Sequence, residues 1–130
     1  MSSDGAKLVR AASKGDDAKV KRLLRAKVDV NFGGSGHCST ALQQACCKGH
    51  VGATQLLLKA KASVDLRDLK GCTALYGASQ NGHPENVRLL LEAKATVDLV
   101  TIDGCAPLYV ACQEGHLECG RLLLEAKAML

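Results

Sequence analysis

Cysteine and histidine are the residues whose types and spacing could support chemistry in this chain. The 130 residues include seven cysteines and four histidines. Cys46 precedes His50 by four residues, and Cys112 precedes His116 by the same interval. Thiolate and imidazole are common zinc ligands, and an exposed thiolate can react with oxidants. The first question is therefore whether these residues form a metal site or a redox site.

The histidines recur at a fixed interval, which points to a repeated structural unit. The dipeptides Gly49-His50, Gly82-His83 and Gly115-His116 follow one another at 33 residues. The same period relates Leu42, Leu75 and Leu108, and also Lys61, Lys94 and Lys127. A fixed period of this length is typical of a solenoid, in which each unit packs only on its neighbours.

The repeat argues against a metal site and against disulfides. Equivalent residues of neighbouring units lie about one helix-packing distance apart, ~10 Å. Zinc ligands lie about 2.0–2.3 Å from the metal, and a disulfide needs Cα atoms within about 7 Å. Cys72 and Cys105 are therefore poorly spaced to share an ion. We expect Cys46 and Cys112 to be small buried side chains. The thiols expected nearer the surface are those of Cys38, Cys47, Cys72 and Cys105. No cofactor is predicted.

Each unit carries the signals of two short helices and a turn. Thr40 and Thr73 are good N-caps for the first helix, and Pro107 occupies the first helical position where the threonine is missing. This helix is expected to end at the glycine of the Gly-His pair, because glycine accepts the left-handed conformation. Leucine triplets beginning at Leu56, Leu89 and Leu122 are expected on the inner side of the second helix. The linker "SVDLRDLKGC" predicts a short hairpin.

These features together resemble the ankyrin repeat family. The residues that carry the resemblance are Gly71, Thr73, Leu75, Ala78, Gly82, His83, Val87, Leu89, Leu90, Ala95, Val97 and Asp98. The resemblance implies an all-α ankyrin-repeat solenoid of stacked helix-turn-helix units with short hairpin loops. It also implies a single domain over 1–130, with a capping repeat at about 5–31 and repeats at 32–65, 66–98 and 99–130.

The chain departs from the family pattern at two kinds of position. The family usually begins its first helix with T-P-L-H, but here the fourth position is Gln43, Tyr76 or Tyr109. The inter-repeat hydrogen bonds of that histidine are therefore not expected here, and the alternative is that Tyr76 and Tyr109, one repeat apart, stack or share a polar rim. Lysine stands where the family places the glycine that ends the second helix, at Lys27, Lys61, Lys94 and Lys127.

We expect the second helix to stop at these lysines although local propensity favours its continuation. A lysine with positive φ costs about 1 kcal/mol relative to glycine. Its charge at a helix C-terminus recovers about 0.3–1 kcal/mol. The lysine row is thus interpreted as helix termination, on the side away from the hairpin tips.

Charge and composition limit the function classes. Residues 1–27 hold eight basic and three acidic residues, a net +5, while the remainder carries nine basic and ten acidic residues, a net −1. A weak nucleic-acid contact through this basic segment is an alternative function, but aromatic residues make up only 2% and a capping repeat also needs a polar face. No catalytic motif occurs, so enzyme activity is not expected.

Two further expectations concern the location of the protein and the end of the last unit. No signal peptide or membrane-length apolar run occurs, which favours the cytoplasm, with the nucleus possible. The last unit ends on "KAML" without a polar cap, which suggests a fragment of a longer array or a fraying end.

The family resemblance implies a protein–protein interaction module. Its partner would bind the concave surface formed by the hairpin tips and the first helix of each unit, with Leu69 and Ile102 as the expected apolar anchors at successive tips. The alternative for these two residues is packing of hairpin against hairpin. The remaining candidate contacts are His37, Ser39, Cys47, Lys48, Lys70, Cys72, Tyr76, Gln80, Asn81, Asp103, Cys105, Tyr109, Gln113 and Glu114.

The sequence does not identify that protein partner, and we expect a monomer with no small-molecule substrate. The competing class is a purely structural segment of a longer array, without a specific partner of its own.

Overall fold

The described part of the chain folds into four helix pairs. The computed structural model describes residues 3–33 and 39–128. The first helices of the pairs are α1 (Asp4–Lys14), α3 (Ala41–Lys48), α5 (Ala74–Gln80) and α7 (Pro107–Gln113). The second helices are α2 (Asp17–Arg25), α4 (Val51–Lys59), α6 (Pro84–Glu92) and α8 (Leu117–Ala128).

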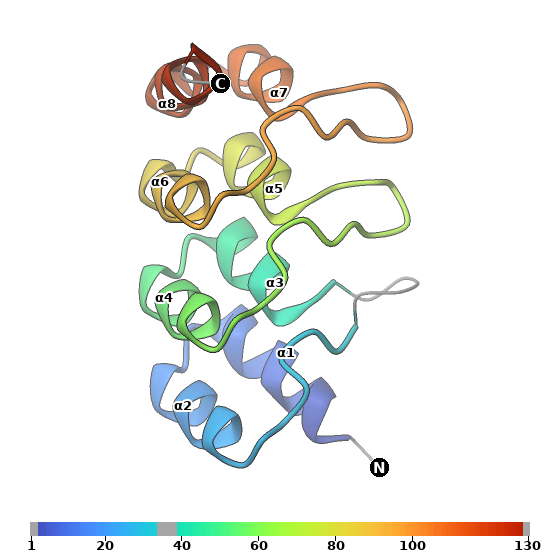
Figure 1. The fold of residues 1–130 in the computed structure, drawn as a ribbon, viewed down its shortest axis with the longest axis vertical. Helices are drawn as coiled ribbons and strands as arrows, with labels where there is room; N and C mark the ends of the chain where they lie inside the picture. The colour runs from blue at the N-terminus through green and yellow to red at the C-terminus, as the bar shows by residue number, and fades with distance from the viewer. Residues whose placement is uncertain (1–2, 34–38, 129–130) are drawn as a thin grey trace.

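The helix pairs stack into two layers. Helices α1, α3, α5 and α7 pack on one another in one layer, and α2, α4, α6 and α8 pack in the other. The linkers project to the side of the first layer (Figure 1). Helices make up all the regular secondary structure of the described residues. This arrangement confirms the predicted all-α solenoid.

The core consists of small and aliphatic side chains at repeated positions. The middle leucine of each triplet is buried: Leu57 and Leu90 are fully enclosed, and Leu123 is 2% exposed. Alanines such as Ala45 and Ala78 fill the space between first helices, where small side chains permit close approach. This explains how a chain almost without aromatic residues can form a continuous core.

The last helix pair corrects two expectations about burial. Cys46 is fully buried as predicted, but Cys112 is exposed. Leu124 is 54% exposed, although the pattern placed its triplet on the inner side. Leu108 is half-buried, while its equivalent Leu75 is 1% exposed. The physical reason is shared: within the described residues, no further helix pair covers α7 and α8.

The first helices begin where the sequence predicts. The Thr40 hydroxyl accepts a hydrogen bond from the Gln43 amide, and the Gln43 side chain accepts one from the Thr40 amide, which completes a capping box. The Thr73 hydroxyl accepts from the Tyr76 amide. Pro107 occupies the first turn of α7 behind Ala106. These local interactions fix the start of each unit.

Glycine and histidine join neighbouring helix pairs at the turn inside each unit. Gly15 and Gly49 have φ of 70° and 77°. A Cβ atom added at Gly49 would lie 2.6 Å from the ring of His83, so the position requires glycine for space as well as for conformation. The ring Nε2 of His83 lies 3.1 Å from the carbonyl oxygen of Cys47. His50 and His116 contact the carbonyls of the preceding units in the same way. The recurring histidine is therefore structural.

Gln43 makes the inter-repeat bonds that the family histidine would make. Its side-chain amide donates to the carbonyl oxygens of Leu66 and Cys72, at 2.8 and 3.2 Å. Because Gln43 is only 7% exposed, these bonds are shielded from water. The departure from the family pattern is thus compensated in this unit by a side-chain amide, whose nitrogen can donate two hydrogen bonds.

Three of the four lysines end their helices as predicted. Lys27, Lys61 and Lys94 have φ of 64°, 68° and 70°, and each follows the C-cap residue of its helix. The prediction is wrong for Lys127, which lies inside α8. The residues after the first three lysines form a linker that leads to the next helix pair, whereas Lys127 is followed by Ala128, a good helix former.

Candidate protein-binding surface

The two described hairpin tips are built by side-chain and backbone bonds within each linker. At the first tip, one carboxylate oxygen of Asp68 accepts from the amides of Lys70 and Cys72, both at 2.9 Å. At the second tip, the Thr101 hydroxyl accepts from the Cys105 amide at 3.2 Å. Backbone bonds from Asp68 N to Cys72 O and from Thr101 N to Cys105 O close the loops. The predicted hairpins are therefore tight turns without regular strands.

The tips are also joined to each other through the backbone. The amide of Ile102 donates to the carbonyl oxygen of Lys70 at 3.0 Å. This bond leaves both apolar tip side chains in solvent, with Leu69 53% and Ile102 74% exposed. Packing of hairpin against hairpin does not bury these side chains. The Leu69 and Ile102 side chains therefore form a pair of exposed apolar groups on turns that backbone hydrogen bonds hold in place.

The sequence prediction missed a third apolar residue at this edge. Val100 is 41% exposed and lies two positions before Ile102. The signal in the sequence is that Val100 occupies the position held by Arg67 in the preceding unit, so an apolar side chain replaces a charged one.

The predicted contact residues of the first helices lie next to the tips in the sequence and differ in exposure. Tyr109 of α7 is 56% exposed, and Tyr76 of α5 is half-buried. The Asn81 side chain donates to the carbonyl oxygen and to the Sγ of Cys47, each at 3.0 Å. Lys48 donates to the Ser13 hydroxyl at 3.3 Å. The bonds made by Asn81 and Lys48 tie neighbouring units together, so these predicted contact residues also have structural partners.

The remaining predicted contacts occupy two environments. Ser39 and Cys105 are half-buried, and His37 and Cys38 lie outside the described residues. The exposed members are Lys70, Gln80, Asp103, Gln113 and Glu114. They come from the tips and from the C-terminal ends of α5 and α7.

Two titratable groups of this surface, the Cys72 thiol and the Tyr76 hydroxyl, have raised pKa values that make them weaker nucleophiles at neutral pH. Partial burial, together with the neighbouring Asp68 carboxylate, raises the pKa of the Cys72 thiol. Partial burial likewise raises the pKa of the Tyr76 hydroxyl. A thiol with a raised pKa holds less thiolate at neutral pH and reacts more slowly with oxidants. In the described ranges, no three histidine, cysteine, aspartate or glutamate side chains gather closely enough to hold a metal ion.

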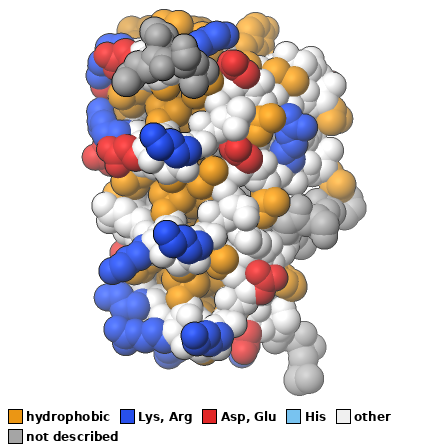
Figure 2. Space-filling view, in the orientation of Figure 1, with side chains coloured by type: hydrophobic (Ala, Val, Ile, Leu, Met, Phe, Trp, Pro, Cys, Tyr) orange, Lys and Arg blue, Asp and Glu red, His pale blue; other side chains and the backbone are white. Residues whose placement is uncertain are grey.

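The basic residues predicted in the first segment lie away from the tips. Lys21, Arg22 and Arg25 are exposed on α2, and Arg10 and Lys14 are exposed on α1. In Figure 2, Lys and Arg side chains crowd the lower left edge, which is the side of the second helices. Across the residues that the structure describes, no helix is both long and apolar enough to cross a membrane.

Comparison with known families agrees with this geometry. A family model described as ankyrin repeats (3 copies) matches residues 8–101 and, in an overlapping match, residues 70–129. Nearly the whole described chain is covered. The chain belongs to the ankyrin repeat family.

Ankyrin repeats are generally protein–protein interaction modules, and the family is typically non-catalytic. Family membership therefore gives the coarse functional class of this protein, and the surface that binds must be argued from its own residues.

Proposed function

We propose that this protein binds a partner protein through the edge formed by its hairpin tips and the adjoining ends of the first helices. The observation that carries the proposal is the exposure of Leu69 and Ile102, 53% and 74%, on turns that backbone bonds hold in place. A rigid apolar side chain loses little conformational freedom on binding, so its burial by a partner contributes most of its transfer free energy to affinity.

The chemistry of the edge suggests what a partner must offer. Leu69 and Ile102 are flanked by the exposed charges of Lys70 and Asp103. An apolar centre with a polar rim is the usual organisation of a protein-binding patch. We infer that the partner presents an apolar recess with polar groups around it, and that Tyr76 and Tyr109 contribute beside this centre.

The test is affinity capture with the purified chain, followed by identification of the retained proteins. The variant Leu69→Ala/Ile102→Ala should lose the partner, with affinity lower by about 30-fold to 1,000-fold, because truncation of each central anchor typically costs about 1–2 kcal/mol. Both side chains are exposed, so the stability of the fold should change by less than about 0.5 kcal/mol per site.

The matched control is Leu117→Ala/Leu124→Ala, which removes two leucines that are 83% and 54% exposed on α8. This variant should keep the partner. If both double variants retain it equally, the proposal is wrong.

The exposed leucines of α8 favour a second candidate function. They form an apolar face on the last described helix pair, of the kind that a further repeat would cover. In this candidate the chain is a structural segment within a longer array. Loss of the captured protein in the Leu117→Ala/Leu124→Ala variant, with retention in the tip variant, would support this second function over the first.

A further inference from the structure

The lysines that follow the second helices form a continuous edge on the other side of the molecule from the tips. We define the lysine edge as Lys27, Lys61 and Lys94, which all have positive φ, with the last-turn residues Arg25 and Lys59. All five side chains are exposed. A charge at a helix C-terminus offsets part of the backbone strain, yet glycine would remove all of it. Helix termination alone does not require a lysine with a strained backbone in three successive units.

The charge of this edge changes along the stack. Two residues before each of the three lysines stand Arg25, Lys59 and Glu92. The edge is therefore doubly basic at the first two units and locally neutral at the third. Figure 2 shows Lys and Arg side chains dominating the lower left edge, with Asp and Glu side chains joining them higher up.

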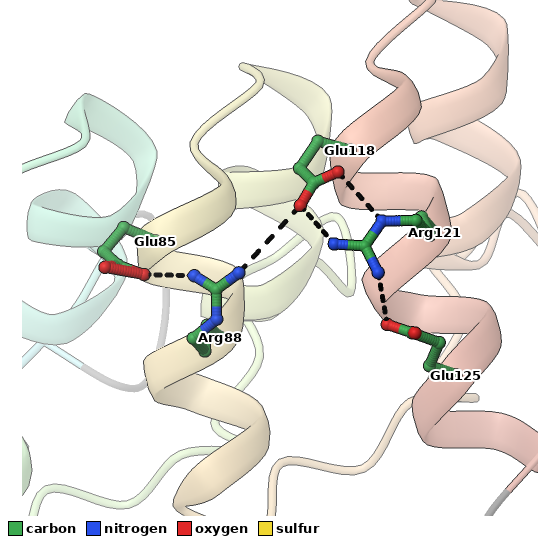
Figure 3. A network of polar contacts seen from close by, with 5 residues as sticks. All are labelled: Glu85, Arg88, Glu118, Arg121 and Glu125. Carbon is green, nitrogen blue, oxygen red and sulfur yellow. Dashed lines mark hydrogen bonds and ion pairs between the residues drawn. The ribbon is translucent and has the colours of Figure 1, made fainter.

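Ion pairing also differs between the first two units and the last two. On α6 and α8, the charges form a network in which Arg88 contacts Glu85 and Glu118, and Arg121 contacts Glu118 and Glu125 (Figure 3). By contrast, none of the five cations of the lysine edge forms an ion pair with a described carboxylate. The positive charge at α2 and α4 is thus available to a partner.

An apolar groove continues the edge where its charge becomes neutral. It lies between α6 and α8 and has a volume of about 570 Å³. Leu91, Ala95 and Val97 line it from one unit and Leu122 and Ala126 from the next. The charged residues among its lining are Arg88, Glu92, Lys94 and Asp98. A volume in this range accommodates one or more side chains of a bound segment. In the left half of Figure 2, hydrophobic side chains alternate with Lys and Arg side chains from the top of the molecule to the bottom.

The spacing of the edge matches an extended peptide. Neighbouring helices of one layer pack at about 8–10 Å, which sets the distance between successive lysine positions. A polyproline II segment rises about 3.1 Å per residue with three residues per turn. Every third side chain therefore points to the same side at about 9 Å intervals, close to the spacing of the units.

We propose that the lysine edge binds an extended acidic segment of a partner protein, with carboxylates on Lys27 and Lys61 and an apolar side chain in the groove between α6 and α8. The groove argues for a peptide over a lipid headgroup layer, because a flat anionic surface has no group to fill it. Nucleic acid is disfavoured because the edge has no aromatic side chain on which bases could stack. This surface is independent of the tips, so either proposal can fail without the other.

The test uses a fluorescent synthetic peptide with glutamate at every third position, proline between the glutamates, and two leucines at one end. A second peptide with the reversed sequence tests whether the segment binds the edge in the opposite chain direction. A version with glutamine in place of glutamate is the matched control. The full chain should bind one glutamate peptide, with affinity falling as salt rises, and should bind the glutamine peptide at least about five-fold more weakly.

Variants of the chain separate charge, backbone and groove. Lys27→Gly/Lys61→Gly should keep the fold and weaken binding by about three-fold to ten-fold, since each exposed ion pair contributes modestly. Lys27→Arg/Lys61→Arg keeps both charges and should bind as the parent does. Ala126→Leu should fill the groove and weaken binding, whereas Leu69→Ala/Ile102→Ala at the tips should leave it unchanged.

Several outcomes would overturn the proposal. These are absence of binding to both glutamate peptides, equal binding of the glutamine peptide, and unchanged affinity in the Lys→Gly variant. Tighter binding to vesicles containing phosphatidylserine or to single-stranded oligothymidine would assign the edge to a membrane or to nucleic acid instead. Sedimentation of the chain alone tests whether a second copy of the chain occupies the groove. A dimer that is lost in the Ala126→Leu variant would show that it does, and would overturn the proposal.

Discussion

Replacement of Lys94 by glycine tests the conformation that ends α6. Lys94 has φ of 70°, and its amide donates to the carbonyl of Leu91 at 3.0 Å. The next amide, that of Ala95, donates to the carbonyl of Leu90 at 3.0 Å. These two bonds form a Schellman motif, which places a left-handed residue directly after the C-cap. The helix therefore ends through backbone geometry that favours glycine over lysine.

The expected change in stability follows from two opposing contributions. The left-handed conformation costs lysine about 1 kcal/mol relative to glycine. The lysine charge near the helix C-terminus returns about 0.3–1 kcal/mol. Lys94→Gly should therefore raise the free energy of unfolding by about 0–0.7 kcal/mol. High salt screens the charge but not the strain, so the gain should be larger in high salt.

The assay is equilibrium denaturation by urea, in which stability changes shift the midpoint at constant slope. Lys94→Ala removes the charge but keeps the strain, so it should be less stable than Lys94→Gly by about 1 kcal/mol. The second control is Lys127→Gly. Lys127 lies within α8 and its Nζ is 3.5 Å from a carboxylate oxygen of Asp98. Glycine there should destabilise by up to about 1 kcal/mol. Marked destabilisation by Lys94→Gly, or equal stability of its glycine and alanine variants, would refute the reasoning.

Three further predictions concern other parts of the fold. Burial raises the pKa of the Cys46 thiol from 9.0 to about 11. Stability from Cys46 should be fully present below pH 9 and fall by about 2–3 kcal/mol as pH rises to about 11; Cys46→Ser should lose this dependence in thermal melts, and an unchanged pH profile would contradict it. Gln43→Ala leaves buried groups without partners and should cost about 2 kcal/mol in urea denaturation, whereas Gln43→His, the family residue, should restore most of it. Leu117→Lys/Leu124→Lys should reduce self-association in light scattering without lowering the melting temperature; equal scattering would show that this apolar face is not adhesive.

Much of the architecture could be predicted from the sequence because its signals are local and repeated. The threonine and proline N-caps and the left-handed glycines each act within one turn of the chain. The strongest case is Lys94, where the period overrode helix propensity and correctly predicted a positive φ. The exposure of Leu69 and Ile102 also agrees with the prediction, although their function as anchors stays a prediction.

Other features depended on contacts between units that the period does not specify. The two carbonyl acceptors of Gln43 come from the next linker, so their identity required the packed structure. The groove between α6 and α8 exists only because side chains from two units leave space between them.

The clearest division lies between Lys94 and Lys127, which share the local sequence "LLLEAKA". The sequence by itself determined the repeat, the helix boundaries of the inner units and the strained lysines. Only the tertiary structure decided that the helix continues through Lys127 instead of ending there, as α6 does before Lys94. The physical reason is that the chain after Lys94 must turn into a linker that leads to a further helix pair, α7 and α8, whereas no helix pair follows Lys127 within the described residues.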